Sequence, residues 1–266
     1  VGTATCKFRY WAFLNTNKEV SETFTVDAID IYLFAVYDTG VSTSFELTDD
    51  GYYIPTSTDG KTTQTRFSDY TLNDGEIYSV DMTLPADWST YTDDCGPVFS
   101  ASAFNEEKTS FIGEPYVTMF ISAPTKANGA IEFWGDVDTP NGTVEAQLIA
   151  RYRLGGDLLK DTPYEKKMLA YQESDEEATF TLTYRRVERT VEGVTKISYY
   201  IGIDGIEYIC LTTGEVAVRY SEISNAANAF STKHTGNIVG LRAKTKGVKY
   251  SNITVKKASE LNVKFY

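Results

Sequence analysis

Alternation of apolar and polar residues along short runs, broken by turn-forming residues, is the feature that most limits how this chain folds. In one run Ile131, Phe133 and Val137 occupy odd positions, and mostly polar residues occupy the even ones. The segment 138–142, Asp-Thr-Pro-Asn-Gly, supplies turn chemistry because proline fixes φ and glycine tolerates positive φ. A second run then places apolar residues on one face, at Val144, Ala146, Leu148, Ala150 and Tyr152. Side chains alternate between the two faces of a β-strand, so this pattern predicts a β-hairpin.

The same rhythm returns later in the chain. The segment 179–187 alternates threonines with Phe180, Leu182 and Tyr184. A further hairpin is predicted within 195–211, because Asp-Gly between two apolar runs is the strongest short-range hairpin signal. Helical patterns are confined to two short segments, 161–170 and 221–230. We therefore predict an all-β protein, built as a two-sheet antiparallel β-sandwich.

The 266 residues are enough for one large β domain with a proper core. Strand-like runs occur throughout and no flexible linker intervenes, so a single domain over 1–266 is predicted. The likeliest internal boundary by composition lies at 94–96. On that division, a β extension over 1–94 packs on a core over 95–258.

Charge and hydropathy limit the partners of the chain. The sequence has 37 acidic and 25 basic side chains, for a net charge of -12. Nucleic acid is therefore not expected as a partner, because phosphate binding needs a basic surface. No run of about 18 apolar residues is present, so no membrane insertion is expected.

Histidine and cysteine carry little predicted chemistry. His234 is the only histidine and lies in a polar stretch, so we expect it to be exposed and without a role. A single histidine argues against zinc sites built on histidines and against catalytic triads. The three cysteines, Cys6, Cys95 and Cys210, are widely spaced and have no metal-ligand spacing. One disulfide with a free thiol and three reduced, buried cysteines both stay open.

The C-terminal part of the chain has a familiar order of features. Ile203-Asp204-Gly205 is followed by the strand-like segment 236–243, Gly-Asn-Ile-Val-Gly-Leu-Arg-Ala, and then by 248–255, Val-Lys-Tyr-Ser-Asn-Ile-Thr-Val. Over residues 196–257 the chain resembles the concanavalin A-like lectin/glucanase superfamily, and is most similar to its laminin-G-like and fructan-binding branches. The resemblance implies a jelly roll with one concave and one convex sheet. It also implies that sugar binding, glycan cleavage and calcium binding are all precedented for such a fold.

The best candidate site is the run 132–138, Glu-Phe-Trp-Gly-Asp-Val-Asp. On a regular strand Glu132, Trp134 and Asp136 share one face. A tryptophan beside carboxylates is typical of a sugar-binding surface, because the ring offers a flat apolar platform with polar groups nearby. Glycan cleavage needs two carboxyl groups about 5–9 Å apart. The alternating carboxylates of the resembled family are only partly matched, since Trp134 occupies the middle position, and a solvated face leading into a turn is the plain alternative.

A second candidate lies in the polar segment 85–94. There Trp88 and Tyr91 precede Asp93 and Asp94, and this arrangement suits a sugar site or a calcium site at a loop edge. Calcium takes six to eight oxygen ligands. The predicted calcium ligands are therefore Asp93 and Asp94, with Asp138 as a third, although no dense ligand loop is present.

Three hypotheses of function follow. The first is a non-catalytic carbohydrate-binding module of an extracellular or cell-surface protein, with a polysaccharide as partner; tyrosine-rich composition and the resemblance support it. The second is a structural or adhesive protein, such as a filament, fibre or adhesin domain, that self-associates. The third is a hydrolase or lyase that uses carboxylates of the 132–138 run. An enzyme is the less favoured reading, because no nucleophile motif or catalytic histidine pattern occurs.

Overall fold

The computed structural model describes two compact units, which cover 1–42 and 43–266. The residues that it describes are 7–13, 33–38, 44–57, 64–87, 95–102, 117–121, 129–217, 229–244, 247–258 and 264–265. In the first unit, β1 (Lys7–Phe13) pairs with β2 (Leu33–Asp38) in antiparallel orientation. The candidate site lies in the second unit.

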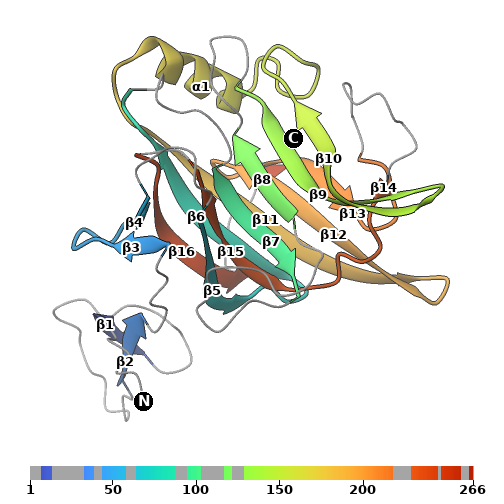
Figure 1. Ribbon diagram of the computed structural model, residues 1–266, viewed down its shortest axis with the longest axis horizontal. Helices are drawn as coiled ribbons and strands as arrows, with labels where there is room; N and C mark the ends of the chain where they lie inside the picture. The colour runs from blue at the N-terminus through green and yellow to red at the C-terminus, as the bar shows by residue number, and fades with distance from the viewer. Residues whose placement is uncertain are drawn as a thin grey trace. The chain divides into compact units, whose positions relative to one another are not determined.

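The second unit is a β-sandwich of two sheets, which is not closed into a barrel (Figure 1). The seven-stranded sheet has the order β10-β9-β8-β7-β15-β5, with β14 paired to β9. Its strands are β5 (Gln64–Thr71), β7 (Gly96–Ala101), β8 (Val117–Ile121), β9 (Ile131–Thr139), β10 (Gly142–Tyr152), β14 (Ala229–Phe230) and β15 (Ile238–Ala243). The prediction of an all-β sandwich is confirmed.

The eight-stranded sheet has the order β17-β13-β12-β11-β6-β16-β4-β3. Its strands are β3 (Phe45–Leu47), β4 (Tyr53–Pro55), β6 (Glu76–Leu84), β11 (Ala178–Val191), β12 (Val194–Ile203), β13 (Ile206–Thr212), β16 (Lys249–Lys257) and β17 (Lys264–Phe265). Strands from the beginning of this unit are hydrogen-bonded to strands from its end: β6 lies between β11 and β16, and β5 pairs with β15. All pairings are antiparallel except that of β13 with β17.

Both predicted hairpins form. Pro140 and Asn141 connect β9 to β10, and Thr139 is paired with Gly142. At the other hairpin, Asp204 and Gly205 have φ angles of 50° and 81°. This is the left-handed conformation that an Asp-Gly turn accommodates with least strain.

The predicted faces of β10 are only partly correct. The pairing of β10 with β9 shifts register between Val144 and Gln147, and again between Leu148 and Ala150. Each extra residue turns the following side chains to the other face. Leu148, predicted to face the core, is therefore paired with the outward-facing Trp134 and is only half-buried, whereas Ile149 is buried. Val144 pairs with the buried Val137 but is itself exposed.

Tyrosines fill much of the space between the sheets. Tyr78, Tyr184, Tyr199 and Tyr250 are fully buried and come from the eight-stranded sheet. The Tyr78 hydroxyl donates to the Gly240 carbonyl (3.0 Å), and that of Tyr250 donates to the Arg242 carbonyl (2.7 Å). The Tyr184 hydroxyl donates to the Met119 sulfur (2.9 Å), and that of Tyr199 donates to the Gly236 carbonyl (3.1 Å). Burial raises the pKa of all four phenols. These rings therefore serve the core, and their abundance does not support a sugar-binding surface.

One helix, α1 (Pro163–Glu173), lies at one end of the sandwich (Figure 1). Thr162 caps it by accepting from the Glu165 amide at 3.2 Å, and Pro163 suits its first turn. The predicted helix at 161–170 is thus confirmed with shifted bounds. In the other segment, Ala229 and Phe230 form β14 instead, and 221–228 lie outside the described residues. Helix α1 is too short and too polar to cross a membrane, and the described part of the chain has no other helix.

Cys95 and Cys210 are free thiols, and Cys95 is buried in the core. The third cysteine, Cys6, lies outside the residues that the structure describes. A disulfide between Cys95 and Cys210 is therefore absent.

Candidate functional site

Strand β9 carries the candidate site on the outer face of the seven-stranded sheet. From Ile131 to Trp134 it pairs with β8 without any shift of register. Phe133 is buried between the sheets, so its neighbours Glu132 and Trp134 point outward. The extra residues of this hairpin lie in β10, and the predicted shared face of Glu132 and Trp134 is preserved.

Trp134 is the most accessible aromatic ring of this face. Its side chain is 37% exposed, which is unusual for so large an apolar residue. Its indole Nε1 donates to Oε2 of Glu132 at 3.1 Å. The hydrogen bond fixes the orientation of the ring, and the apolar surface of the ring stays open to a ligand.

Glu132 is buried and is held from both sides. While Oε2 accepts from Trp134, Oε1 accepts from Nε of Arg151 at 2.6 Å in an ion pair. Arg151 lies directly opposite Glu132 on β10, and its side chain is 32% exposed. A buried carboxylate needs such donors, since an unpaired charge in the interior is costly. Glu132 is therefore placed to hold two neighbours rather than to shuttle a proton.

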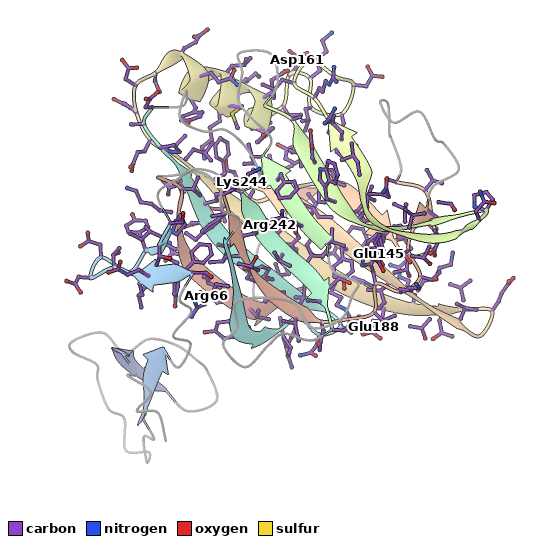
Figure 2. The ribbon with its side chains drawn as sticks, viewed as in Figure 1. Arg66, Glu145, Asp161, Glu188, Arg242 and Lys244 are labelled. Atoms are coloured by element: carbon purple, nitrogen blue, oxygen red, sulfur yellow. The ribbon has the colours of Figure 1, made fainter. Side chains whose placement is uncertain are left out.

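The outer face continues from Glu132 toward β15. Phe120 on β8 lies directly opposite Glu132, and Gly96 on β7 lies beside Phe120. Arg242 on β15 pairs with Gly96 and extends its guanidinium over the Phe120 ring, with Cζ 5.2 Å from the ring centroid. Figure 2 labels Arg242 over the strands of this sheet. We call Trp134, Glu132, Arg151, Phe120 and Arg242 the outer-face site.

Asp136 does not lie on the solvated surface that the alternation predicts. It is buried, with 4% of its surface exposed, and its backbone carbonyl accepts from the Ser231 amide at 3.2 Å and faces Nε2 of His234 at 3.0 Å. The physical reason is the pairing of β14 with the end of β9, which places the segment after β14 against Asp136. Local alternation gives no information about such a neighbour.

Asp138 anchors the same segment. Its carboxylate accepts four hydrogen bonds: from the Thr143 and Ser231 hydroxyls at 2.8 Å each, and from the Thr232 amide and hydroxyl at 2.7 and 3.0 Å. Desolvation acts to raise the pKa of Asp138, but these bonds together lower it below its ordinary value. They also use the lone pairs that a calcium ion would need.

His234 is buried, contrary to the prediction of an exposed loop residue. None of its surface is exposed, and its ring stacks on Phe230 with centroids 4.4 Å apart. Only Nε2 has a hydrogen-bond partner, the Asp136 carbonyl, whereas Nδ1 has none among the described residues. Desolvation lowers the pKa of His234 to about 4. Because polar residues surround His234 in the sequence, its burial in the core could not be predicted from its neighbours.

The second predicted site cannot be placed. Trp88, Tyr91, Asp93 and Asp94 all lie outside the described residues. Within the described ranges, no group of three or more histidine, cysteine or acidic side chains is arranged to hold a metal ion. Calcium binding by the 93–94 segment stays a prediction.

Sequence reasoning missed three members of the outer-face site, Arg151, Phe120 and Arg242. Arg242 belongs to the segment 236–243, which the sequence analysis connected only with the resemblance. Its outward position could be inferred from the alternation of Val239, Leu241 and Ala243, all of which are buried. Its proximity to β9 had no signal in the sequence, because β15 lies about a hundred residues away along the chain.

Comparisons with models of protein families, with curated proteins and with solved structures found no match to this chain. The similarity to the concanavalin A-like superfamily therefore stays a prediction that rests on residues 196–257.

Proposed function

We propose that the protein is a non-catalytic carbohydrate-binding module that recognises a polysaccharide on the outer face of its seven-stranded sheet. The observation that carries this proposal is the exposed Trp134 ring, which is held in place through the buried Glu132. A sugar ring has apolar C–H faces and polar edges, so an oriented indole beside hydrogen-bond donors suits it. Under this proposal the protein works outside the cell or at its surface.

Preorganisation supports binding rather than catalysis. Because Trp134 is already oriented through Glu132 and Arg151, little conformational entropy is lost when a ligand docks. Both Glu132 oxygens accept hydrogen bonds, and Asp136 is buried. The paired, accessible carboxyl groups that glycoside hydrolysis requires are therefore not offered by this pair.

The test is binding to a panel of soluble polysaccharides, with and without calcium. We expect a saturable change in tryptophan fluorescence with one glycan class. Calorimetry with Trp134→Ala should then show binding weakened at least about tenfold, or about 1.4 kcal/mol. Leu169→Ala is the matched control, because Leu169 is 42% exposed on α1 and lies outside the outer-face site. Full-strength binding by the Trp134→Ala variant, or no binding of any glycan by folded protein, would refute the proposal.

A structural or adhesive function is the second candidate, and the β11–β12 hairpin favours it. Beyond Arg185, β11 pairs only with β12, so the end of this hairpin extends past the neighbouring strands (Figure 1). It carries Val191 and Val194, which are 48% and 59% exposed. Exposed apolar residues at such a position suit contact with another chain.

If the hairpin end mediates assembly, the protein should self-associate at high concentration in sedimentation experiments. Replacing both valines by serine should return it to the monomer, because the apolar contact area is lost. Thr190→Ser, at an exposed position of the same hairpin, provides the control. A wild-type protein that stays monomeric at the highest concentration would exclude this second candidate.

A further inference from the structure

Arg242 is a cation without a matching anion among the described residues. Its Nε is buried and has no hydrogen-bond partner, and none of the described carboxylates forms an ion pair with its guanidinium. The one carboxylate among the five residues of the outer-face site is that of Glu132, and Arg151 already neutralises it. These five residues therefore hold one positive charge in surplus, in a protein whose overall net charge is -12.

The Phe120 ring compensates Arg242 only in part. A cation over an aromatic face is attracted by the quadrupole of the ring, but the ring carries no net negative charge. The planar donors of a guanidinium are better satisfied by a carboxylate or sulfate, which binds in a bidentate manner. Arg242 therefore fits an anionic group supplied by a ligand.

The position of Arg242 suits a ligand that also covers Trp134. Its guanidinium lies over β8, the strand next to β9. Neighbouring strands are about 4.8 Å apart, so the charge lies roughly one strand spacing from the row of Glu132 and Trp134. Phe120 and Glu132 are themselves buried, so a polymer would contact this site through the Trp134 indole and the half-buried Arg242.

We propose that the ligand is an acidic polysaccharide, whose carboxylate or sulfate groups pair with Arg242 while a sugar ring packs on Trp134. This inference rests on the proposed function and adds the chemical class of the ligand. The surplus charge and the unpartnered Nε support it. The Glu132–Arg151 ion pair has no net charge, so it holds the Trp134 ring in place without repelling the anion.

The experiment compares two ligands that differ only in charge. Calorimetry is carried out with a uronic acid oligosaccharide and with the same oligosaccharide after reduction of its carboxyl groups to alcohols. We expect the charged form to bind at least about tenfold more tightly, because hydrogen bonds to charged groups are stronger than those to neutral groups. A sulfated neutral oligosaccharide forms a third arm and distinguishes sulfate from carboxylate recognition.

Variants of Arg242 link this preference to the site. Arg242→Gln should lower affinity for the charged ligand about tenfold and affinity for the reduced ligand by much less. Arg242→Lys keeps the charge but loses the planar donors, so its affinity for the charged ligand should lie between those of the wild type and of Arg242→Gln. Arg189→Gln, an exposed arginine on β11, should have no effect. Unchanged thermal unfolding of each variant rules out a loss of folding as the cause.

The outcomes separate this inference from the proposed function. Equal binding of the charged and reduced ligands, with loss of both in Trp134→Ala, would overturn the acidic class and keep the carbohydrate module. A charge preference that persists in Arg242→Gln would overturn the role of Arg242. The absence of binding to every ligand by folded protein would overturn both.

Discussion

Acidification should destabilise this protein through a single buried histidine. The pKa of His234 is about 4 in the folded chain, because burial disfavours its charged form, against about 6.5 in an unfolded one. Between these values the unfolded chain binds a proton that the folded chain does not, so stability falls as the pH falls. We expect a loss of about 3 kcal/mol between pH 7 and pH 4. Below pH 4 this contribution no longer changes.

The groups around His234 also affect how stability depends on pH. Asp138 and the Asp136 carbonyl stabilise a positive charge there, but desolvation outweighs both. The lowered pKa of Asp138 adds a further loss of stability only below its unfolded value near 3.8. The loss of stability between pH 4 and 6.5 is therefore assigned to the titration of His234.

Because His234 is the only histidine, its titration can be followed directly by NMR. Urea unfolding at several pH values gives the stability, and the His234→Gln variant should lose the slope between pH 4 and 6.5. A glutamine there can still donate to the Asp136 carbonyl, which makes it the closest uncharged replacement. An ordinary pKa near 6.5 in the folded protein, or an unchanged slope in the variant, would contradict the prediction.

Replacement of Gly96 by alanine should cost about 3 kcal/mol or more. An added Cβ would lie 1.8 Å from the Met119 carbonyl oxygen and 2.9 Å from the Met119 carbonyl carbon. These are backbone atoms of the adjacent strand β8, so no side-chain rotation relieves the contact. Overpacking of a core typically costs about 1–3 kcal/mol, and here two strands must separate.

Gly193→Ala is the matched control for this substitution. Gly193 lies in the turn between β11 and β12 with φ of 79°, and nothing lies within 4 Å of an added Cβ. Its replacement should cost only about 1–2 kcal/mol, from the left-handed conformation. Urea unfolding of both variants makes the comparison. A Gly96→Ala protein as stable as the Gly193→Ala protein would show that β7 and β8 separate easily.

Features that depend on neighbours in the chain were predictable from the sequence. The Asp204-Gly205 turn and the shared outward face of Glu132 and Trp134 follow from conformational preferences and from the two-residue period of a strand. Features that depend on pairing between distant strands were not. The burial of Asp136 and His234 follows from the docking of the segment after β14 on β9. The two register shifts of β10, which turn Leu148 to the outer face and bury Ile149, have no signature in alternation.

In the candidate site, too, some residues are brought together by a local pattern and others by the pairing of distant strands. Glu132 and Trp134 are two residues apart, and a local pattern brings them together. Arg151, Phe120 and Arg242 join them only because β10, β8 and β15 lie in one sheet in a fixed register. The chemical class that we propose for the ligand rests on Arg242, so it could be inferred only from the structure.

The tyrosine hydroxyls between the sheets have a mechanical consequence. Apolar packing alone allows two sheets to slide over one another at low cost, because dispersion contacts are not directional. The hydrogen bonds from Tyr78 and Tyr250 to carbonyls of β15 are directional, and a sliding motion would break them. Under the proposed function, a bound polymer would pull along one sheet. These bonds would transmit that shear force to the other sheet, so the two layers would bear the load as one body.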